Sequence, residues 1–163
     1  MKSRILIATL LLFVGLPVQA EPLVSINPAK SEVAVGETFS VDIIMTDFPA
    51  SEGGGLTLGF KPTVVKVNKV SVNTGVWSFA SKAGVIDNVQ GEVSNILFSK
   101  FPGVSGNVTI ATVELQAVGI GPTQLKLLES SLNPFASRGQ RLAVTFSKGK
   151  VVAKTAQTNG IKR

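Results

Sequence analysis

The sequence predicts an all-β protein, a nine-stranded sandwich of two antiparallel sheets. Short runs rich in Val, Ile, Thr and Phe recur along the chain, and Gly, Pro, Asn or Ser interrupts them about every ten residues. Many of these runs alternate apolar and polar residues, and none shows sustained helical periodicity. The 16 Gly and 8 Pro residues supply the turns that such a fold needs. A two-sheet sandwich fits this pattern better than a closed barrel does.

The first twenty residues have the pattern of a secretory signal peptide. Lys2 and Arg4 form a basic start, residues 5–16 an apolar stretch, and residues 18–20 a small-residue cleavage site. The apolar stretch is too short for a membrane anchor, and Pro17 ends it. We therefore expect an exported protein without a membrane anchor, located in the periplasm or outside the cell.

The remaining chain is long enough for one domain with its own hydrophobic core. We expect the signal peptide in residues 1–20, one β-sandwich domain in residues 21–154 and a flexible tail in residues 155–163. Because the sequence contains no Cys, the core alone must stabilise this domain.

The expected strands follow from the alternation of apolar residues and from the turn residues between them. They span residues 23–26, 38–46, 56–60, 64–72, 77–79, 93–99, 108–118, 124–128 and 142–152. In the second strand, Phe39, Val41, Ile43 and Met45 share one face, which predicts that they are buried. The alternation changes phase within 64–72 and within 108–118, which predicts a β-bulge or a change of sheet in each.

Composition excludes most catalytic designs. The sequence contains no His and no Cys, so Ser-His triads, thiol nucleophiles and His/Cys zinc sites are impossible. A glycosidase needs two carboxylates, but the acidic residues are sparse and lie mostly at strand edges or turns. The net charge is +6, yet the basic residues are scattered singly, which argues against a nucleic-acid partner. We therefore expect no enzymatic activity.

The expected cofactor content is none, with structural calcium as the less favoured alternative. Exported sandwiches hold calcium with oxygen ligands on loops, and four carboxylates are candidates if the fold brings them together. They are Asp42, Asp47, Glu52 and Asp87. No DxDxDG-like spacing supports such a site.

Two aromatic residues are the candidates for a carbohydrate site. Trp77 is the single Trp, and Phe79 follows two residues later, so in a strand both side chains share a face. Sugars stack on exposed aromatic rings, whereas large aromatic side chains are mostly buried. Core packing is the favoured interpretation, and a ligand platform is the alternative.

The strand at residues 93–99 has a composition typical of a protein-contacting surface. Ile96 and Phe98 share one face, and Leu97 lies on the other. The residues of the Leu97 face are expected to be Val93, Asn95, Leu97 and Ser99. One apolar residue among small polar ones, followed by Lys100, is a mixture found in interfaces. The alternative is an isolated exposed Leu without a role.

Four segments together carry a family resemblance. They are VGETFSVD at 35–42, LTLGFKPTVVKV at 56–67, GNVTIATVELQAV at 106–118 with GPTQL at 121–125, and VTFSKGKVV at 144–152. In order and spacing they resemble the strands of the cohesin domain, the module that binds dockerin in cellulosomes and belongs to a wider superfamily of carbohydrate-binding modules.

The resemblance implies a nine-stranded jelly-roll sandwich, no enzymatic activity, binding across one sheet face, and a link to polysaccharide breakdown or cell-surface assembly. On that face it points to Asn88, Leu97, Ser99 and Lys100. Members that bind dockerin often carry Asn and Asp where this chain has Gly53 and Gly55. They also commonly carry an acidic residue at the position of Lys100, and a reversed charge selects a different partner.

Three functions remain open at the level of the sequence. The first is an exported cohesin-like module that binds a protein partner, dockerin-like or different, through Asn88, Leu97, Ser99 and Lys100. The second is a carbohydrate-binding module that contacts polysaccharide through Trp77 and Phe79. The third, less favoured, is a structural subunit or adhesin of the cell envelope.

Overall fold

The computed structural model describes residues 21–156, and in this part of the chain all regular structure is β-strand. The predicted signal peptide and the end of the predicted tail lie outside the described residues. The strands are β1 (Leu23–Pro28), β2 (Glu32–Ala34), β3 (Thr38–Gly59), β4 (Val65–Val72), β5 (Phe79–Lys82), β6 (Val85–Asp87), β7 (Glu92–Ala117), β8 (Gly121–Glu129), β9 (Ala136–Ser137), β10 (Gln140–Arg141), β11 (Thr145–Phe146) and β12 (Gly149–Lys154). No helix long and apolar enough to cross a membrane occurs in residues 21–156.

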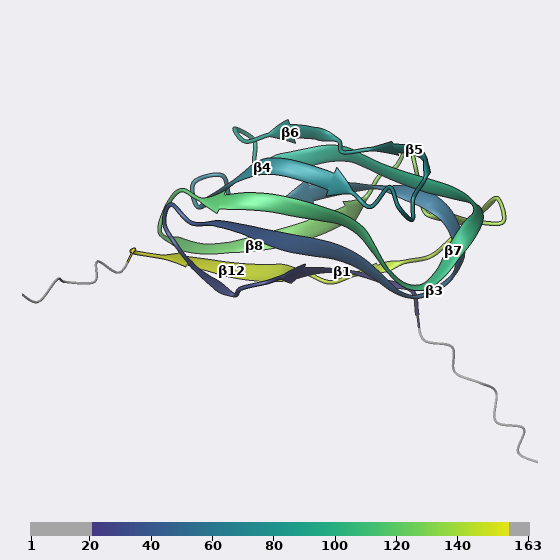
Figure 1. Ribbon diagram of the computed structural model, residues 1–163, viewed down its shortest axis with the longest axis horizontal. Helices are drawn as coiled ribbons and strands as arrows, with labels where there is room; N and C mark the ends of the chain where they lie inside the picture. Colours follow the sequence, from purple (N-terminus) through teal and green to yellow (C-terminus); the bar gives the residue numbers. More distant parts are fainter. Residues whose placement is uncertain (1–20, 157–163) are drawn as a thin grey trace, which may run out of the picture.

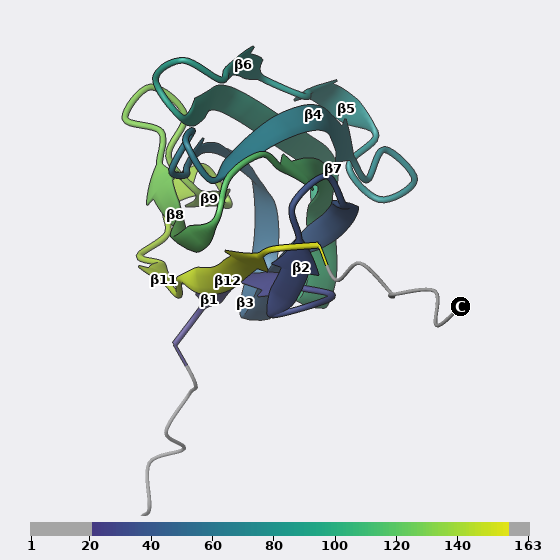
Figure 2. The same cartoon turned by 90° about the vertical axis from the view of Figure 1, so that its left-hand side faces the viewer.

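The strands form two layers, and β3 and β7 run through both of them (Figure 1). One layer contains β5, β6, residues 92–99 of β7, residues 53–59 of β3 and the end of β8. In the other layer, β1, the first part of β3, the last part of β7 and β4 pair in that order. The start of β8 pairs with β12, and β12 pairs in parallel with β2. Figure 2 shows β5 and β6 on one side of the core and β1, β2 and β12 on the opposite side.

The all-β prediction is confirmed, but residues 21–156 contain twelve strands and not the predicted nine. The predicted strands at 38–46 and 56–60 are one strand, β3, and those at 93–99 and 108–118 are one strand, β7. The pairing of β3 with β7 continues between these segments through several register shifts. Residues 46–52, which read as a loop in the sequence, therefore lie in a stretch of bulges where β3 passes from one layer to the other, and Gly53 to Gly55 pair regularly with β7.

One hydrophobic core fills the space between the layers. Phe39, Val41, Ile43 and Met45 are buried, as the alternation predicted. Three rings form the centre of the core: Trp77 packs edge-on against Phe98 with centroids 4.8 Å apart, and Phe98 packs against Phe135 at 5.4 Å. Such edge-to-face pairs add stability beyond the area that they bury.

The two predicted changes of phase are both register irregularities in the structure. In β4 the pairing with β7 shifts between Val67 and Lys69. In β7 the irregularity lies beside Ile110, where the partners of Ile43 and Ile44 are Ala111 and Thr109. Each bulge lets the strand keep apolar residues inside although the alternation changes.

Glu37, in the turn between β2 and β3, forms an ion pair with Lys30, which lies between β1 and β2. Lys30 Nζ lies 2.5 Å from Glu37 Oε1, and the Ala34 N–H donates to Glu37 Oε2 at 3.0 Å. The hydrogen bond from Lys30 and that from Ala34 lower the pKa of the Glu37 carboxyl. Because this pKa is lower in the folded chain than in the unfolded one, the stabilising effect is present above the ordinary Glu pKa and is lost as the pH falls through the lowered value.

Candidate protein-binding face

The outward surface of the layer that contains β5, β6, β7, β3 and β8 is the candidate site, and we call it the outer sheet face. Residues directly opposite each other in antiparallel strands share a side of the sheet, so the register defines rows of neighbours. The rows are Phe79, Ser99 and Gly53; Lys82, Leu97 and Gly55; Val85 and Ser94; Thr57 and Leu128; and Asp87, Glu92, Gly59 and Lys126. Leu56, Leu58, Ile96 and Leu127 alternate with them and are buried in the core.

A bulge at Asn95 determines which residues of β7 belong to this face. Asn95 has a φ of 57°, and the pairing with β3 shifts between Leu56 and Leu58. Val93 is therefore buried together with Ile96 and Phe98, whereas Ser94, Leu97 and Ser99 point outward. The predicted face for Val93 is wrong because the extra residue changes the alternation.

The outer sheet face exposes large apolar side chains at both of its edges. Phe79 is 67% exposed and Val85 64%, both on the edge strands, and Leu128 on β8 is 64% exposed. Leu97 lies between these edges and is partly exposed. Several exposed apolar side chains on one face, bordered by charged ones, are a feature of interaction surfaces.

One end of the face is hollowed, and we call this depression the apolar hollow. It has a volume of about 510 Å³. Its lining includes Gly53, Leu97, Ser99, Leu132 and Pro134. Leu132 is 84% exposed and lies on the segment that follows β8. The charged residues of the lining are one acid, Glu52, and one base, Lys82.

Close packing explains the glycines at the end of this hollow. Gly53 has a φ of +141°, and a Cβ built there would lie 2.2 Å from the Phe98 carbonyl oxygen. A Cβ on Gly55 would lie 2.9 Å from Leu97 Cδ2 and 2.9 Å from Ser130 Cβ. The Gly55 N–H also donates to the Asn133 carbonyl at 2.8 Å. The Asn and Asp that the resemblance leads one to expect at these two positions therefore do not fit this backbone arrangement.

Leu97 and Ser99 lie on the outer sheet face, in adjacent rows. The Ser99 hydroxyl donates a hydrogen bond to the Phe79 carbonyl and so links β7 to the edge strand β5. Lys100 follows Ser99, outside the rows that the register defines, and its side chain is partly exposed. The structure thus brings together two of the four predicted contact residues.

Asn88 makes hydrogen bonds to the backbone of β4. Its Oδ1 accepts a hydrogen bond from the Val67 N–H at 2.7 Å, and its Nδ2 donates to the Val67 carbonyl at 2.9 Å. The side-chain amide therefore pairs with the β4 backbone as a neighbouring strand would. The amide joins the turn after β6 to β4, in the other layer, with one donor and one acceptor in use. Asn88 therefore has a structural role that the sequence did not indicate, and its contact with a partner stays a prediction.

Asn88→Ala is expected to lower the free energy of unfolding by about 1–2 kcal/mol, because both hydrogen bonds to Val67 are lost. Asn68→Ala, on the next residue of β4, is the control: its amide makes one exposed contact, at 3.4 Å from Glu114. The control should change stability by less than about 0.5 kcal/mol. Urea denaturation of both variants measures the difference, and equal stabilities would contradict a structural role for Asn88.

The two aromatic candidates for carbohydrate binding are separated by the fold. Trp77 is 0% exposed, and its Nε1–H donates to the Thr109 carbonyl at 3.3 Å. Phe79, in contrast, points to solvent. The prediction of a shared face is wrong because Trp77 precedes β5 and is not part of a strand. The favoured interpretation of Trp77 as a core residue is confirmed, and it offers no ring face to a sugar.

The carboxylates considered for calcium accept hydrogen bonds at separate places in the fold. Thr112 Oγ1 donates to Asp42 Oδ1 at 2.6 Å, and the Gly139 N–H donates to Glu52 Oε2 at 3.0 Å. Asp87 Oδ1 accepts from the N–H groups of the turn after β6. Within residues 21–156, no three acidic side chains lie close enough together to hold a metal ion. The calcium alternative therefore has no assembled site in the described chain.

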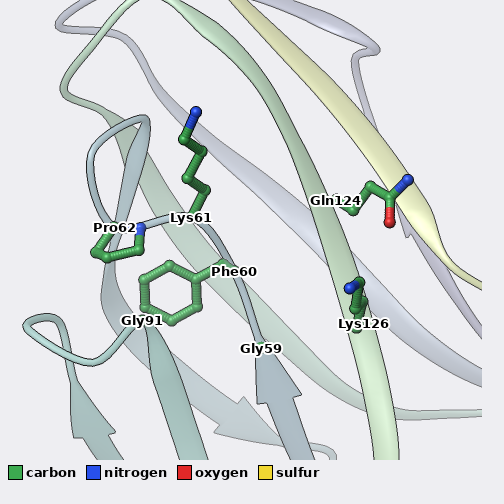
Figure 3. A pocket seen from close by; sticks show the side chains of 7 residues that line it. All are labelled: Gly59, Phe60, Lys61, Pro62, Gly91, Gln124 and Lys126. Atoms are coloured by element: carbon green, nitrogen blue, oxygen red, sulfur yellow. The ribbon is translucent and has the colours of Figure 1, made fainter.

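A second hollow, which the sequence did not reveal, lies at the opposite end of the outer sheet face. We call it the lysine hollow; its volume is about 450 Å³. It is lined by Gly59, Phe60, Lys61, Pro62, Gly91, Gln124 and Lys126. Figure 3 shows Lys61 on the turn after β3, across the hollow from Gln124 and Lys126 on β8. The only signal in the sequence was the alternation of β8, and the lysines appeared isolated because Lys61 comes from a turn and Lys126 from a strand far along the chain.

The sequence matches no protein-family model and no curated protein. The fold, however, is similar to solved cohesin structures. A non-cellulosomal cohesin from the archaeon Archaeoglobus fulgidus superposes with a TM-score of 0.69 at 13% identity, over 83% of this chain and 93% of that one. The seventh ScaB type I cohesin of Pseudobacteroides cellulosolvens gives 0.65 at 15% identity, over 88% and 98%.

A third similar structure is the third ScaC cohesin of Acetivibrio cellulolyticus, in complex with the ScaB dockerin. Its TM-score is 0.62 at 18% identity, over 83% of this chain and 99% of that one. Each likeness spans nearly the whole cohesin chain. Together with the strand pairing above, these superpositions show that the protein is a β-sandwich with the jelly-roll fold of cohesins.

Proposed function

We propose that the protein is an exported, non-catalytic module that binds a protein partner of the dockerin type through its outer sheet face. The observation that carries the proposal is the exposed apolar surface of Phe79, Val85, Leu97 and Leu128, which belong to four strands of one layer, with β3 between the strands of Leu97 and Leu128. Export, and a role in polysaccharide breakdown or cell-surface assembly, belong to the same proposal.

The chemistry of this surface supports a protein partner. Its centre is apolar, and its borders carry Lys82, Asp87, Glu92 and Lys126. Protein interfaces have this anatomy, with an apolar core that loses water and a polar rim that stays wet. Similar structures include cohesins bound to dockerins, among them the ScaC cohesin in complex with the ScaB dockerin.

The partner should differ from the dockerins of those complexes in its detailed chemistry. Gly53 and Gly55 contribute no side-chain hydrogen bond to the face. Specificity is a difference between affinities, so a missing hydrogen-bonding pair and a changed charge both alter which partner binds. We therefore expect a partner of the dockerin class on the outer sheet face, with contact residues that differ from those of the known dockerins.

Replacing Phe79, Val85 and Leu128 together by Ser should abolish capture of the partner from the exported proteins of the source organism. All three side chains are exposed, so the variant should fold normally. Buried aromatic and aliphatic anchors in interfaces contribute about 2 kcal/mol or more when they are hot spots, so a loss of affinity of at least 30-fold is expected. Calorimetry with the captured partner measures this loss.

The matched control replaces Val89, Val118 and Ile120 by Ser. These side chains are also exposed and apolar, but they lie on turns outside the rows of the outer sheet face. The control should capture the partner as the unaltered protein does. If both variants bind equally, the outer sheet face is not the interface. If the unaltered protein is retained on a glycan array and captures no protein, the carbohydrate-binding alternative replaces the proposal.

A further inference from the structure

The lysine hollow is continuous with the outer sheet face. Gly59 and Lys126 line the hollow and also belong to the last row of the face, together with Asp87 and Glu92. A partner that covers the face therefore also reaches the mouth of the hollow. Its floor and walls contain Phe60, which is buried, and Pro62 (Figure 3).

Three lysines surround this hollow or border it. The turn that carries Lys61 is held to β8, because the Lys61 N–H donates to Thr123 Oγ1 at 3.0 Å. Lys150 on β12 lies directly opposite Gln124 on β8, and Lys126 lies two residues further along β8 on the same side. Such diagonal neighbours have Cα atoms about 7–8 Å apart, within reach of one ligand for two lysine side chains.

The positive charge of these lysines is not neutralised by an ion pair. The ion pairs in residues 21–156 involve Lys30, Arg141 and Lys154, and none of the three lysines at the hollow. Glu92 is in the same row as Lys126, but Gly59 of β3 lies between them. Two strand spacings correspond to about 10 Å, roughly the screening length at moderate salt.

The two hollows differ in charge and lie at opposite ends of the face. Gly53 at the apolar hollow and Gly59 at the lysine hollow are six residues apart on β3, which corresponds to roughly 20 Å. The apolar hollow contains one acid and one base, Glu52 and Lys82. The charged residues in the lining of the lysine hollow are Lys61 and Lys126, both basic.

We propose that the lysine hollow binds acidic side chains of the protein partner and so fixes the direction in which the partner docks. The inference rests on the proposed function and deepens it. The partner carries Asp or Glu residues about 20 Å from an apolar anchor, a separation that follows from the strand rise. Reversing the partner would place its acidic end beside Glu52 and leave the lysines without counter-charge, which costs energy.

In the test, hexaglutamate is added to the ¹⁵N-labelled domain, residues 21–156, and the amide signals are followed by NMR. Titration should shift the amide signals of Lys61, Gln124, Lys126 and Lys150, and the affinity should fall as salt is raised. The triple variant Lys61→Gln, Lys126→Gln and Lys150→Gln should bind at least tenfold more weakly. Lys66→Gln, Lys69→Gln and Arg138→Gln together remove the same charge elsewhere and should leave the affinity within twofold.

Two results would overturn the inference. One is that hexaglutamate does not bind, or that the triple variant at the hollow binds it no more weakly than the control variant does. The other is tighter binding of hexagalacturonate than of hexaglutamate, which would assign the hollow to an acidic polysaccharide. Neither result affects the proposed function, which depends on capture through Phe79, Val85 and Leu128 and is measured separately.

Discussion

Trp77→Ala should lower the free energy of unfolding by about 3–5 kcal/mol, the range for large aromatic deletions in packed cores. Trp77 is fully buried, and its ring packs at 4.8 Å from Phe98, which in turn packs on Phe135. The substitution leaves a cavity at the centre of this aromatic cluster. It also removes the donor to the Thr109 carbonyl, which β7 holds close to the core.

Phe79→Ala is the control for this prediction, since it lies two residues away and exposes its ring. It should change stability by less than about 0.5 kcal/mol, as exposed substitutions do. Thermal and urea unfolding compare the stabilities of the two variants. Near-ultraviolet circular dichroism is used to detect unfolding of the Phe79 variant. A Trp77 variant as stable as the Phe79 variant would mean that the Trp77 ring is not in the core.

Gly53→Ala should destabilise the protein by at least about 2 kcal/mol, because it combines backbone strain with a steric clash. The φ of +141° is a conformation that residues with a Cβ rarely adopt, and the added atom would lie 2.2 Å from the Phe98 carbonyl oxygen. Relief of the clash requires β3 and β7 to separate at the apolar hollow. Signals of Leu97 and Ser99 in NMR spectra should therefore shift as well.

Gly36→Ala separates the effect of backbone strain from that of the steric clash. Gly36 also has a positive φ, +93°, but no atom lies within 4 Å of the Cβ position. This variant should show only the conformational cost, about 1 kcal/mol. If the Gly53 and Gly36 variants lose the same stability in urea denaturation, close approach of the strands is not the reason for glycine at position 53.

The sequence was sufficient to predict the fold class and most buried positions, because alternation in a half-buried strand directly records which side faces the core. Phe39 to Met45 and Leu56 to Leu58 are examples, and both changes of phase were located correctly. The number of strands was not predictable in this way. Residues 47–55 have a loop-like composition, yet they continue the ladder through bulges.

The candidate site was predictable only in part, and bulges again explain the difference. The bulge at Asn95 moves Val93 into the core and leaves Leu97 and Ser99 outside. Trp77 and Phe79 differ because a strand begins between them. In each case one residue that departs from the alternation changes the side of the sheet to which a side chain points. The residue types nearby in the sequence do not indicate this change.

Contacts between distant segments account for the remaining differences. The amide of Asn88 binds Val67, which lies 21 residues earlier in the chain. The lysine hollow combines a turn after β3 with β8 and the adjoining β12. Single lysines in the sequence read as solvated surface, and the register of β8 with β12 is needed to place Lys126 near Lys150.

The passage of β3 and β7 through both layers has a mechanical consequence. A pull exerted by a bound partner on residues 53–59 or 92–99 acts on the same continuous backbone that forms the opposite layer through residues 38–46 and 106–117. The two layers share their central strands, so a displacement of these residues is passed along the backbone to the pairing of the opposite layer. Load on the binding surface is thereby shared by hydrogen bonds on the far side of the molecule.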